Sequence, residues 1–472
     1  MTGTTARRSI SLAVVLALSV GLGALGASPA QTAEAISPTL ARPNDPPNIV
    51  LVLSDDQPKG TLAAMPAVSS RIRDKGVLFR NAVIPTSLCC PSRAALLSGN
   101  LAHTTGVYSN DQDNYGGWSA FHDDEDQTLA TELSAAGYQT GLFGKYFNGF
   151  QGVAPGGYVP PGWDAFRVLQ KDDGGDAGYY NYSLTGLPNH YGSTPEDYST
   201  DVLRDLAVDF IESAPSDQPL FVELSVFGPH DPYKPAPRHA GAWAHRAFVP
   251  PAGMNERDMS DKPSWLKDAP RVKRALMAKQ WQRRMETLMS VDEAVQALVR
   301  ALGDRMSNTL FIYLSDNGLM QGIHRLARKS VPYRAATSVP LVMRWDGVIE
   351  PGSASNRITP NIDVTATIAE AAGVSWPMEG RSALSTGRRG VVLEAVTRIA
   401  AEPHPAYCGW RSRGYLYVRY SGGEERELYD YAVDPHELDN VAGKPKYRDI
   451  ETKLERKTKR HCRSVPPGFT WS

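Results

Sequence analysis

Two adjacent cysteines, Cys89 and Cys90, are followed by the sequence Pro-Ser-Arg, which ends at Arg93. Proline suits a first helical turn, and residues 94–97 are good helix formers, so we expect a helix to begin here. A helix start offers unpaired N–H groups and partial positive charge, to which Arg93 adds a full charge. A cysteine at this point would face an anion site. The alternative is a buried thiol pair beside a helix start, which is the commoner role of an arbitrary cysteine.

Two acidic pairs stand at matching places in the chain. Asp55 and Asp56 follow the apolar segment 48–54, and Asp316 and Asn317 follow the apolar segment 309–315. Brought together, these four oxygen donors would repel strongly unless a hard divalent cation neutralised them. No His/Cys cluster accompanies them, which disfavours zinc. A single Asp-Asp pair after a strand is also a common helix cap, but its repetition weakens that alternative.

Four cationic or potentially cationic side chains are further candidates: Arg93, Lys145, His230 and Lys329. Arrayed beside a metal ion, they would bind a tetrahedral oxyanion. Taken singly, each lysine is more typical of a solvated surface, and His230 of a hydrogen-bonded loop. The functional interpretation therefore rests on the whole set.

Continuous apolar segments predict the strands that must position these groups, over 48–54, 76–79, 138–143, 220–226, 309–315 and 339–344. Helical patterns lie between them, over 64–74, 91–97, 128–136 and 198–212, with a longer helix over about 281–302. This alternation predicts a largely parallel sheet with helices on both faces. The candidate residues mostly follow C-terminal strand ends, where such sheets build their sites.

The other segments suggest a second, smaller domain. Residues 150–195 read as an irregular insertion and 231–270 as a long loop. From about residue 389 the pattern changes, with a hairpin predicted over 414–430 and a terminal helix over 447–460. A chain of 472 residues is too long for one compact core. We therefore expect an α/β domain over 46–388 and a small, antiparallel α+β domain over 389–472.

The N-terminus predicts export. Arg7 and Arg8 precede an apolar run and the sequence Ala33-Glu34-Ala35, which together indicate a signal peptide over 1–35, of the general secretory or twin-arginine type. The run is too short for a confident membrane span, so we expect no stable anchor after cleavage. In an oxidising compartment Cys408 and Cys462 could form a disulfide. The net charge of −1 gives no support to nucleic-acid binding.

The cysteine segment resembles the C-x-P-S-R signature of the sulfatase family. The match covers residues 89–93 and continues through Leu97-Ser98-Gly99. Residues 137–140 and 144–146 resemble the second signature of this family, and residues 428–430 and 434–438 resemble a common ending. The resemblance implies an alkaline-phosphatase-like fold. The form Cys-Cys-Pro-Ser-Arg and the sequence over 144–148 are similar to the N-acetylglucosamine-6-sulfatase-like branch.

The resemblance implies that Cys89, not Cys90, is oxidised to formylglycine by a formylglycine-generating enzyme. The hydrated aldehyde would attack the ester sulfur with one hydroxyl and expel sulfate with the other. Arg93 would hold this diol, Lys145 and Lys329 would bind sulfate, and His230 would bind sulfate and protonate the leaving oxygen. The implied metal is Ca²⁺, with Mg²⁺ possible, and its ligands would be Asp55, Asp56, Cys89, Asp316 and Asn317.

One position departs from the family pattern. Many relatives carry a histidine two residues after the lysine of the second signature, where this chain has Phe147, so the base that acts on the diol stays open. Asn148 and His324 are expected to contact substrate, and His103 to be structural.

The sequence thus predicts a secreted, calcium-dependent sulfatase that acts on a sulfated sugar or an aryl sulfate. One alternative is a phosphomonoester or phosphodiester hydrolase of the same fold, although that chemistry usually needs a Ser or Thr nucleophile. The other is a non-catalytic binder of sulfated glycans, which would apply if Cys89 stayed a thiol.

Overall fold

The computed structural model describes residues 45–154, 156–171, 178–385, 387–399 and 403–471. These described residues all belong to one compact unit. The predicted signal peptide lies outside the described residues. Within the described ranges, no helix has both the length and the apolar character needed to cross a membrane.

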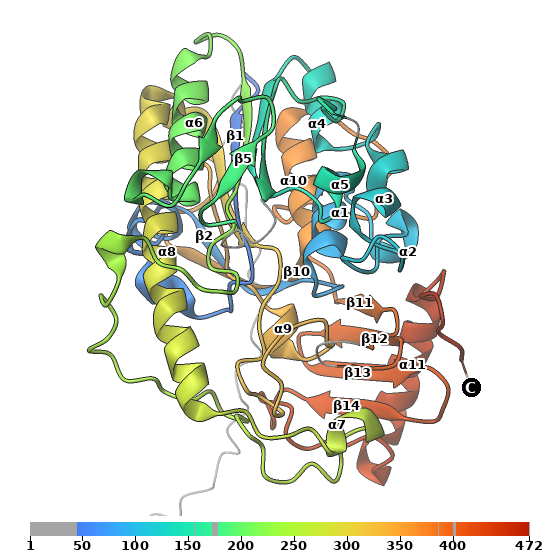
Figure 1. Ribbon diagram of the computed structural model, residues 1–472. Coiled ribbons are helices and arrows are strands. Elements are labelled where there is room, and N and C mark those ends of the chain that lie inside the picture. The colour runs from blue at the N-terminus through green and yellow to red at the C-terminus, as the bar shows by residue number, and fades with distance from the viewer. Residues whose placement is uncertain (1–44, 155, 172–177, 386, 400–402, 472) are drawn as a thin grey trace, which may run out of the picture. The chain divides into compact units, whose positions relative to one another are not determined.

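A ten-stranded sheet forms the centre of the structure (Figure 1), in the order β10-β2-β9-β8-β1-β7-β3-β4-β5-β6. Its strands are β1 (Asn48–Ser54), β2 (Val77–Val83), β3 (Gln139–Gly144), β4 (Ala165–Lys171), β5 (Tyr182–Leu184), β6 (His190–Tyr191), β7 (Leu220–Ser225), β8 (Thr309–Ser315), β9 (Leu341–Arg344) and β10 (Ser353–Pro360). The central strand β1 runs parallel to both of its neighbours, β7 and β8. Their C-terminal ends therefore meet at one edge, which places the groups that follow them side by side.

Helices cover both faces of this sheet. On one face lie α1 (Cys89–Ser98), α2 (Ala102–Thr105), α3 (Gly117–Phe121), α4 (Leu129–Ala135), α5 (Phe150–Val153) and α10 (Asn361–Ala372); on the other lie α6 (Ser199–Ser213) and α8 (Arg274–Leu302) (Figure 1). The alternate residues of β1 divide between two hydrophobic cores, with Leu51 and Leu53 in one and Val50 and Val52 in the other. Burial on both faces explains why the central strands are continuously apolar.

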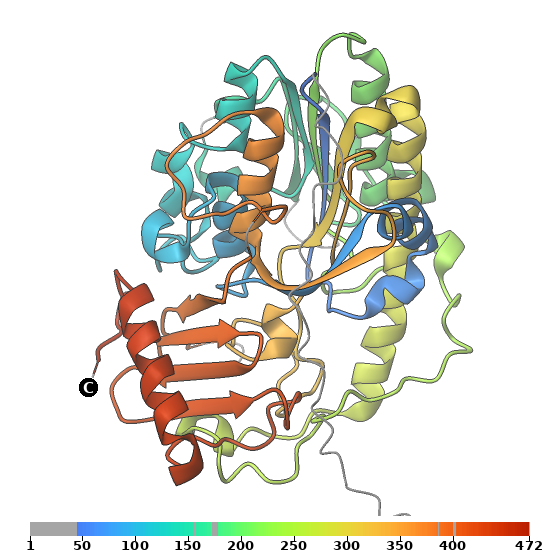
Figure 2. The same cartoon turned by 180° about the vertical axis from the view of Figure 1, so that it is seen from behind.

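A four-stranded antiparallel sheet follows near the C-terminus, made of β11 (Gly390–Ala395), β12 (Tyr407–Ser412), β13 (Tyr415–Tyr420) and β14 (Arg426–Asp430). The terminal helix α11 (Arg448–His461) lies against it, as Figure 2 shows from behind. A disulfide joins Cys408 in β12 to Cys462 at the end of α11, which answers a question that the sequence left open. The domain boundary at residue 388 lies between α10 and β11 and stays a prediction.

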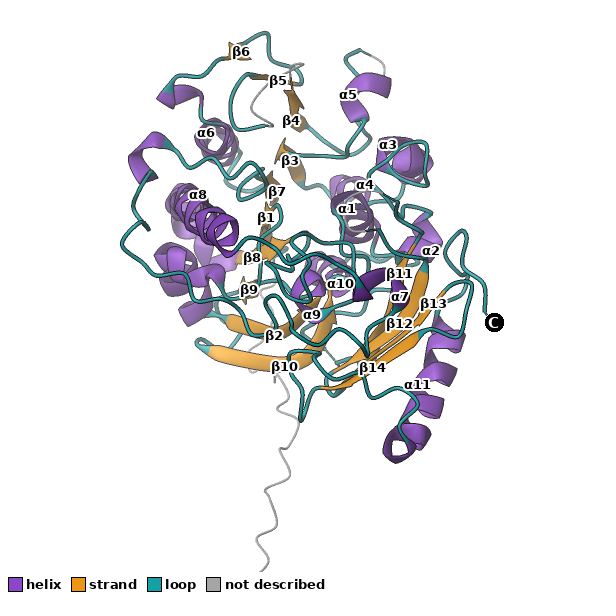
Figure 3. Ribbon diagram, turned by 60° about the horizontal axis from the view of Figure 1, so that its bottom comes forward, coloured by secondary structure: helices purple, strands orange, loops and turns teal. Residues whose placement is uncertain are grey.

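The predicted fold class is confirmed, with three local corrections. Residues 150–195 are not merely an irregular insertion, because they contain β4, β5 and β6. Strand β9 pairs antiparallel with β2 and β8, and β5 and β6 are also antiparallel, at the far end of the sheet (Figure 3). These strands depend on partners distant in sequence, which local patterns do not reveal.

The third correction concerns the helix expected over 64–74. The segment forms short 3₁₀ and π turns, over Thr61–Ala64, Val68–Ile72 and Arg73–Lys75. The Asp292 carboxylate of α8 accepts the N–H groups of Ala67 and Val68, both at 2.8 Å. A side chain of α8, distant in sequence, thus provides the hydrogen-bond acceptors for the N–H groups of Ala67 and Val68. The remaining short helices are α7 (Ser264–Lys267) and α9 (Arg334–Thr337).

Candidate active site

Two neighbouring strand ends build the acidic floor of the site. In the parallel pair β1 and β8, Ser54 lies opposite Ser315, so the residues that follow them come together. The Asp316 N–H donates to the Ser54 carbonyl at 3.0 Å, and the Asp56 N–H donates to Asp316 Oδ1 at 3.1 Å. The side chains of these acidic residues are buried, as are those of Asp55 and Asn317.

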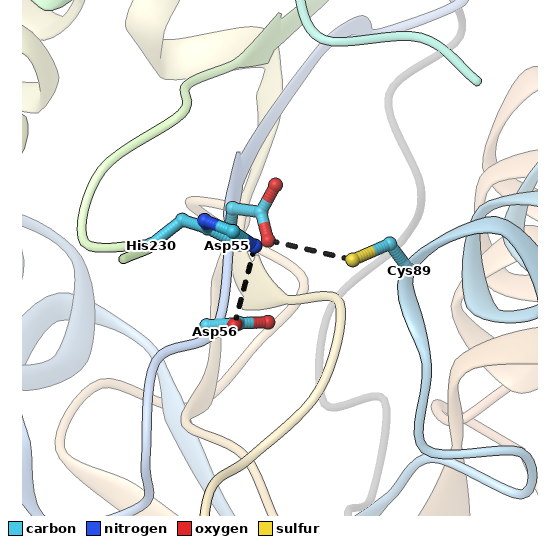
Figure 4. A group of neighbouring side chains, drawn as sticks. All are labelled: Asp55, Asp56, Cys89 and His230. Atoms are coloured by element: carbon cyan, nitrogen blue, oxygen red, sulfur yellow. Dashed lines mark hydrogen bonds and ion pairs between the residues drawn. The ribbon is translucent and has the colours of Figure 1, made fainter. Parts of the chain in front are cut away.

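Helix α1 brings Cys89 to this floor. The helix begins at Cys89 after an extended Leu88, as the Pro-Ser-Arg sequence predicts. The Cys89 thiol donates to Asp55 Oδ1 at 3.7 Å, and the Lys329 ammonium donates to Cys89 Sγ at 2.9 Å. Figure 4 shows the sulfur directed at the Asp55 carboxylate. Burial and the charge of Asp55 raise the pKa of the Cys89 thiol.

Cationic side chains neutralise the buried carboxylates. Lys145 is paired with Asp55, and Lys329 with Asp56. Burial alone would raise the pKa of Asp55, but the nearby cations, Lys145 foremost, outweigh it and hold this pKa well below its usual range. The buried carboxylates and cations therefore compensate one another.

Arg93 bridges the strand ends from the first turns of α1. Its guanidinium donates to Asp316 Oδ2 at 2.9 Å, to Ser225 Oγ at 2.6 Å and to the Lys145 carbonyl at 2.9 Å. Ser225, the last residue of β7, was missed by sequence reasoning. Its position directly before the loop that carries His230 was the available signal.

His230 borders the site on its more open side. Its Nδ1–H donates to the Asp231 carbonyl at 2.6 Å, and its Nε2 lies 3.6 Å from Asp56 Oδ2. Its side chain is 28% exposed, whereas those of Asp55 and Asp316 are 0% exposed. An imidazole nitrogen between a buried carboxylate and solvent is placed for proton transfer.

The carboxylate and amide oxygens of the site suit a hard divalent cation. The structure also brings Cys89 and His230 beside Asp55 and Asp56, although the sequence showed no His/Cys cluster there. These four side chains offer ligand atoms that all lie within 4.8 Å of one another (Figure 4). Asn317 donates through its amide nitrogen to Asp56 Oδ1 at 2.7 Å, and its buried Oδ1 has no hydrogen-bond partner. An orphaned carbonyl oxygen beside carboxylates is a ready ligand for calcium or magnesium.

Asp316 lies outside that group of four. The Arg93 guanidinium and the Asp56 N–H occupy its two carboxylate oxygens. Burial and repulsion from Asp55 raise the pKa of Asp316.

The two predicted substrate contacts differ in placement. Asn148 has an exposed side chain, and its N–H donates to Cys90 Sγ at 3.3 Å, which puts it beside the start of α1. Cys90 itself lies in the core, where burial raises its thiol pKa to about 12. The two buried cysteines of α1 therefore have different surroundings: Cys89 contacts charged side chains, and Cys90 lies among apolar ones.

His324 is not brought to the cluster. It is fully buried, its Nδ1 pairs with Glu256 at 2.5 Å, and its ring packs on Tyr333 with centroids 4.6 Å apart. Its contact with substrate stays a prediction. His103, expected to be structural, pairs with Glu379 and Glu394 and takes no part in the cluster.

Comparison with known proteins identifies the family. The model of the family described as Sulfatase matches residues 47–374. An N-acetylglucosamine-6-sulfatase of Capra hircus is 30% identical over 453 residues, which cover 84% of this chain and 80% of the relative. An N-acetylglucosamine-6-O-sulfatase of Bacteroides thetaiotaomicron is 27% identical, with 86% and 85% covered. An extracellular sulfatase homolog of Drosophila melanogaster is 34% identical over 72% of this chain but only 31% of its own length.

Solved structures share the fold. A protein in complex with its substrate D-glucosamine-2-N,6-O-disulfate superposes with a TM-score of 0.75 at 23% identity, covering 89% of this chain and 99% of the other. A phosphonate monoester hydrolase of Agrobacterium radiobacter superposes with a TM-score of 0.70 at 20% identity, covering 88% and 95%. The family match, the relatives and the shared fold confirm the resemblance drawn from residues 89–93: the chain belongs to the sulfatase family and is a sulfuric ester hydrolase.

Proposed function

We propose that this chain is a secreted, calcium-dependent sulfatase in which residue 89 acts as formylglycine and the substrate is a sulfate ester of a sugar. One observation carries this proposal. The Cys89 sulfur lies between the Asp55 carboxylate, at 3.7 Å, and the Lys329 ammonium, at 2.9 Å, at the mouth of α1. A nucleophile at residue 89 would lie beside both the proposed metal ligands and Lys329, a cation that could bind sulfate.

Modification of Cys89 explains how this position can turn over. A thiol whose pKa is raised by burial is a poor nucleophile at neutral pH, and it has no second hydroxyl with which to expel sulfate. Formylglycine, when present, would supply a hydrated aldehyde with two hydroxyls: one could attack the sulfur as the alcohol leaves, and the other, on losing its proton, would expel sulfate and restore the aldehyde. Arg93 is buried one turn along α1 and would hold the hydrate in place.

The metal ligands would be Asp55, Asp56, Asp316 and Asn317, together with residue 89. A bound Ca²⁺, or Mg²⁺, would lower the pKa of the attacking hydroxyl and polarise the sulfate. Asn317 supports this assignment, since its buried Oδ1 has no partner within the protein. Lys145 and Lys329 would exchange part of their pairing with Asp55 and Asp56 for contacts to sulfate oxygens.

His230 would protonate the oxygen of the leaving alcohol. Its Nδ1–H is bonded to the Asp231 carbonyl, so the transferred proton must come from Nε2. Asp56 Oδ2, at 3.6 Å from Nε2, would stabilise the protonated imidazole before transfer. Asn148 and His324 remain proposed substrate contacts, the first beside the start of α1.

The named relatives also support a proposal for the substrate and for the cellular location. Relatives named for N-acetylglucosamine-6-sulfatase activity make N-acetylglucosamine 6-sulfate the first substrate to test. A relative named as extracellular and the leader over residues 1–35 support secretion. A formylglycine-generating enzyme would be the partner during maturation.

The test combines mass spectrometry with kinetics. The protein is produced with a formylglycine-generating enzyme, and the tryptic peptide 81–93 is examined for an aldehyde at residue 89. We expect the aldehyde and hydrolysis of N-acetylglucosamine 6-sulfate or 4-nitrophenyl sulfate. Full activity with an unmodified thiol would overturn the mechanism. Faster turnover of a phosphate ester would favour the phosphohydrolase alternative, and binding of sulfated glycan without turnover would favour a binder.

A further inference from the structure

A cavity of 210 Å³ lies beside the first turn of α1. It is lined by residues within 86–88, 108–114, 395–399 and 404–407 and by Ser330. Leu88 directly precedes Cys89, and Ser330 directly follows Lys329. The lining therefore includes the chain neighbours of two site residues, although Cys89 and Lys329 themselves do not line it.

Hydrogen bonds fix the walls of this cavity to one another. The Ser330 N–H donates to the Ser87 carbonyl at 2.9 Å, and Thr86 Oγ1 donates to the Glu394 carbonyl at 3.0 Å. The Arg398 guanidinium donates to Ser330 Oγ. These bonds hold the end of β11 and Arg398 beside the segment that precedes α1 and beside Ser330, so the small sheet contributes to the wall of the cavity.

The lining mixes apolar and polar side chains. Its buried residues include the apolar Leu88, Tyr108 and Val396 and the polar Thr86, Ser87, Ser109, Ser330 and His404. Its more exposed residues are the polar Asn110, Asp111, Asn114, Thr397 and Arg398 and the apolar Ile399. A sugar ring has both apolar C–H faces and hydroxyl groups, which suit such a mixed lining, whereas an aryl group would leave the polar side chains unpaired.

The charged residues of the lining indicate which kind of sugar the cavity would accept. Among the described residues that line the cavity, Asp111 carries the one carboxylate and Arg398 the one guanidinium. These two charges are opposite in sign, so the described lining does not favour a second anionic group. Carboxylate and guanidinium groups instead bond efficiently to neutral hydroxyls and amides.

We propose that this cavity binds the sugar ring that carries the sulfate ester, that the ring is otherwise uncharged, and that Asp111 and Arg398 select it. The proposal rests on the proposed function, which supplies the sulfate position at residue 89. In this proposal Asp111 and Arg398 determine specificity by contacting the sugar, and they do not contact the reacting sulfur. Asn110, which lines the cavity, also contacts the first turn of α1, because its Oδ1 accepts the Cys90 N–H at 2.9 Å.

The experiment uses two variants of the formylglycine-bearing enzyme with Ca²⁺, Asp111→Asn and Arg398→Met. Asp111 Oδ1 accepts the Asp113 N–H at 3.2 Å, and asparagine keeps that bond. Each variant has a matched control that does not line the cavity: Asp113→Asn and Arg413→Met, both at exposed positions. The substrates are N-acetylglucosamine 6-sulfate and 4-nitrophenyl sulfate.

We expect each cavity variant to raise KM for the sugar sulfate about tenfold and to leave kcat/KM for the aryl sulfate within about twofold of wild type. The controls should change neither. Equal losses on both substrates, or no loss on the sugar sulfate, would overturn the proposal. So would tighter binding of a glucosamine 2-N,6-O-disulfate than of the singly sulfated sugar.

A second measurement separates this proposal from the proposed function. Saturation-transfer NMR with unsulfated N-acetylglucosamine reports the cavity without any turnover. Binding that Asp111→Asn weakens would support the cavity even if no sulfate ester were hydrolysed, which would overturn the proposed function alone. Hydrolysis of aryl sulfate with no binding or hydrolysis of the sugar would overturn the cavity alone.

Discussion

The Lys329 ammonium nitrogen lies 2.9 Å from the Cys89 sulfur and is also paired with Asp56. Lys329 thus contacts both Cys89, the first residue of α1, and Asp56, which follows β1. No corresponding cation contacts the Cys90 sulfur among the described residues; its bond is to the Asn148 N–H. This difference supports the proposal that the first cysteine of the pair is the reactive one.

Cys89→Ala should reduce kcat/KM for 4-nitrophenyl sulfate by more than about a hundredfold, because the nucleophile is lost. Cys90→Ser should keep kcat/KM within about threefold, since its hydroxyl still accepts the Asn148 N–H. Thermal melts of both variants control for folding. Loss of activity in Cys90→Ser, with Cys89→Ala active, would mean that the assignment is reversed.

Removal of divalent cations by a chelator should abolish turnover, and Ca²⁺ or Mg²⁺ should restore it, because three buried carboxylates face one another. Asn317→Ala should weaken Ca²⁺ binding about tenfold or more, measured as the Ca²⁺-dependent rise in Tm. Asp209→Asn, at an exposed position on α6, should bind as wild type. Restoration by zinc alone would contradict this metal assignment.

His230→Gln should slow hydrolysis of a sugar sulfate about a hundredfold but leave 4-nitrophenyl sulfate nearly unaffected. An alkyl alcohol leaves only with a proton, whereas 4-nitrophenolate is stable without one. Steady-state kinetics on the two esters measure the difference, with the exposed His245→Gln as control. Equal effects on both esters would show that His230 binds sulfate without acting as the acid.

His103 should stabilise the fold in a pH-dependent way. Burial lowers its pKa, but hydrogen bonds to Glu379 and Glu394 outweigh burial and raise the pKa to about 10. The unfolded pKa is about 6.5, so the stabilisation is complete below pH 6.5 and is lost as pH rises through about 10. His103→Gln should therefore lower the free energy of unfolding by about 2 kcal/mol at pH 6.

Denaturant titrations of wild type and His103→Gln across pH 6 to 10 would check this, since the gap between them should shrink as pH rises. Glu394 lies in β11 and His103 in α2, so the pairing of these two side chains links the small sheet to α2. A gap that grows with pH would contradict the assigned sign.

The sheet and its strand-end groups could be predicted from sequence because each depends on local pattern. Segment 48–54 is apolar throughout and ends at Asp55, and segment 309–315 repeats this before Asp316. Strands β4 to β6 escaped prediction, since their short segments are stabilised by pairing with neighbours and not by their own periodicity.

The sequence by itself determined the family, through residues 89–93, and the kinds of side chain at the site. Only the tertiary structure decided their relations: Cys89 between Asp55 and Lys329, Cys90 in the core, and His324 buried against Glu256. The physical reason is that helix and strand periods are local, whereas these contacts join residues that are 34 to 240 positions apart in the chain. Long-range packing alone sets those distances.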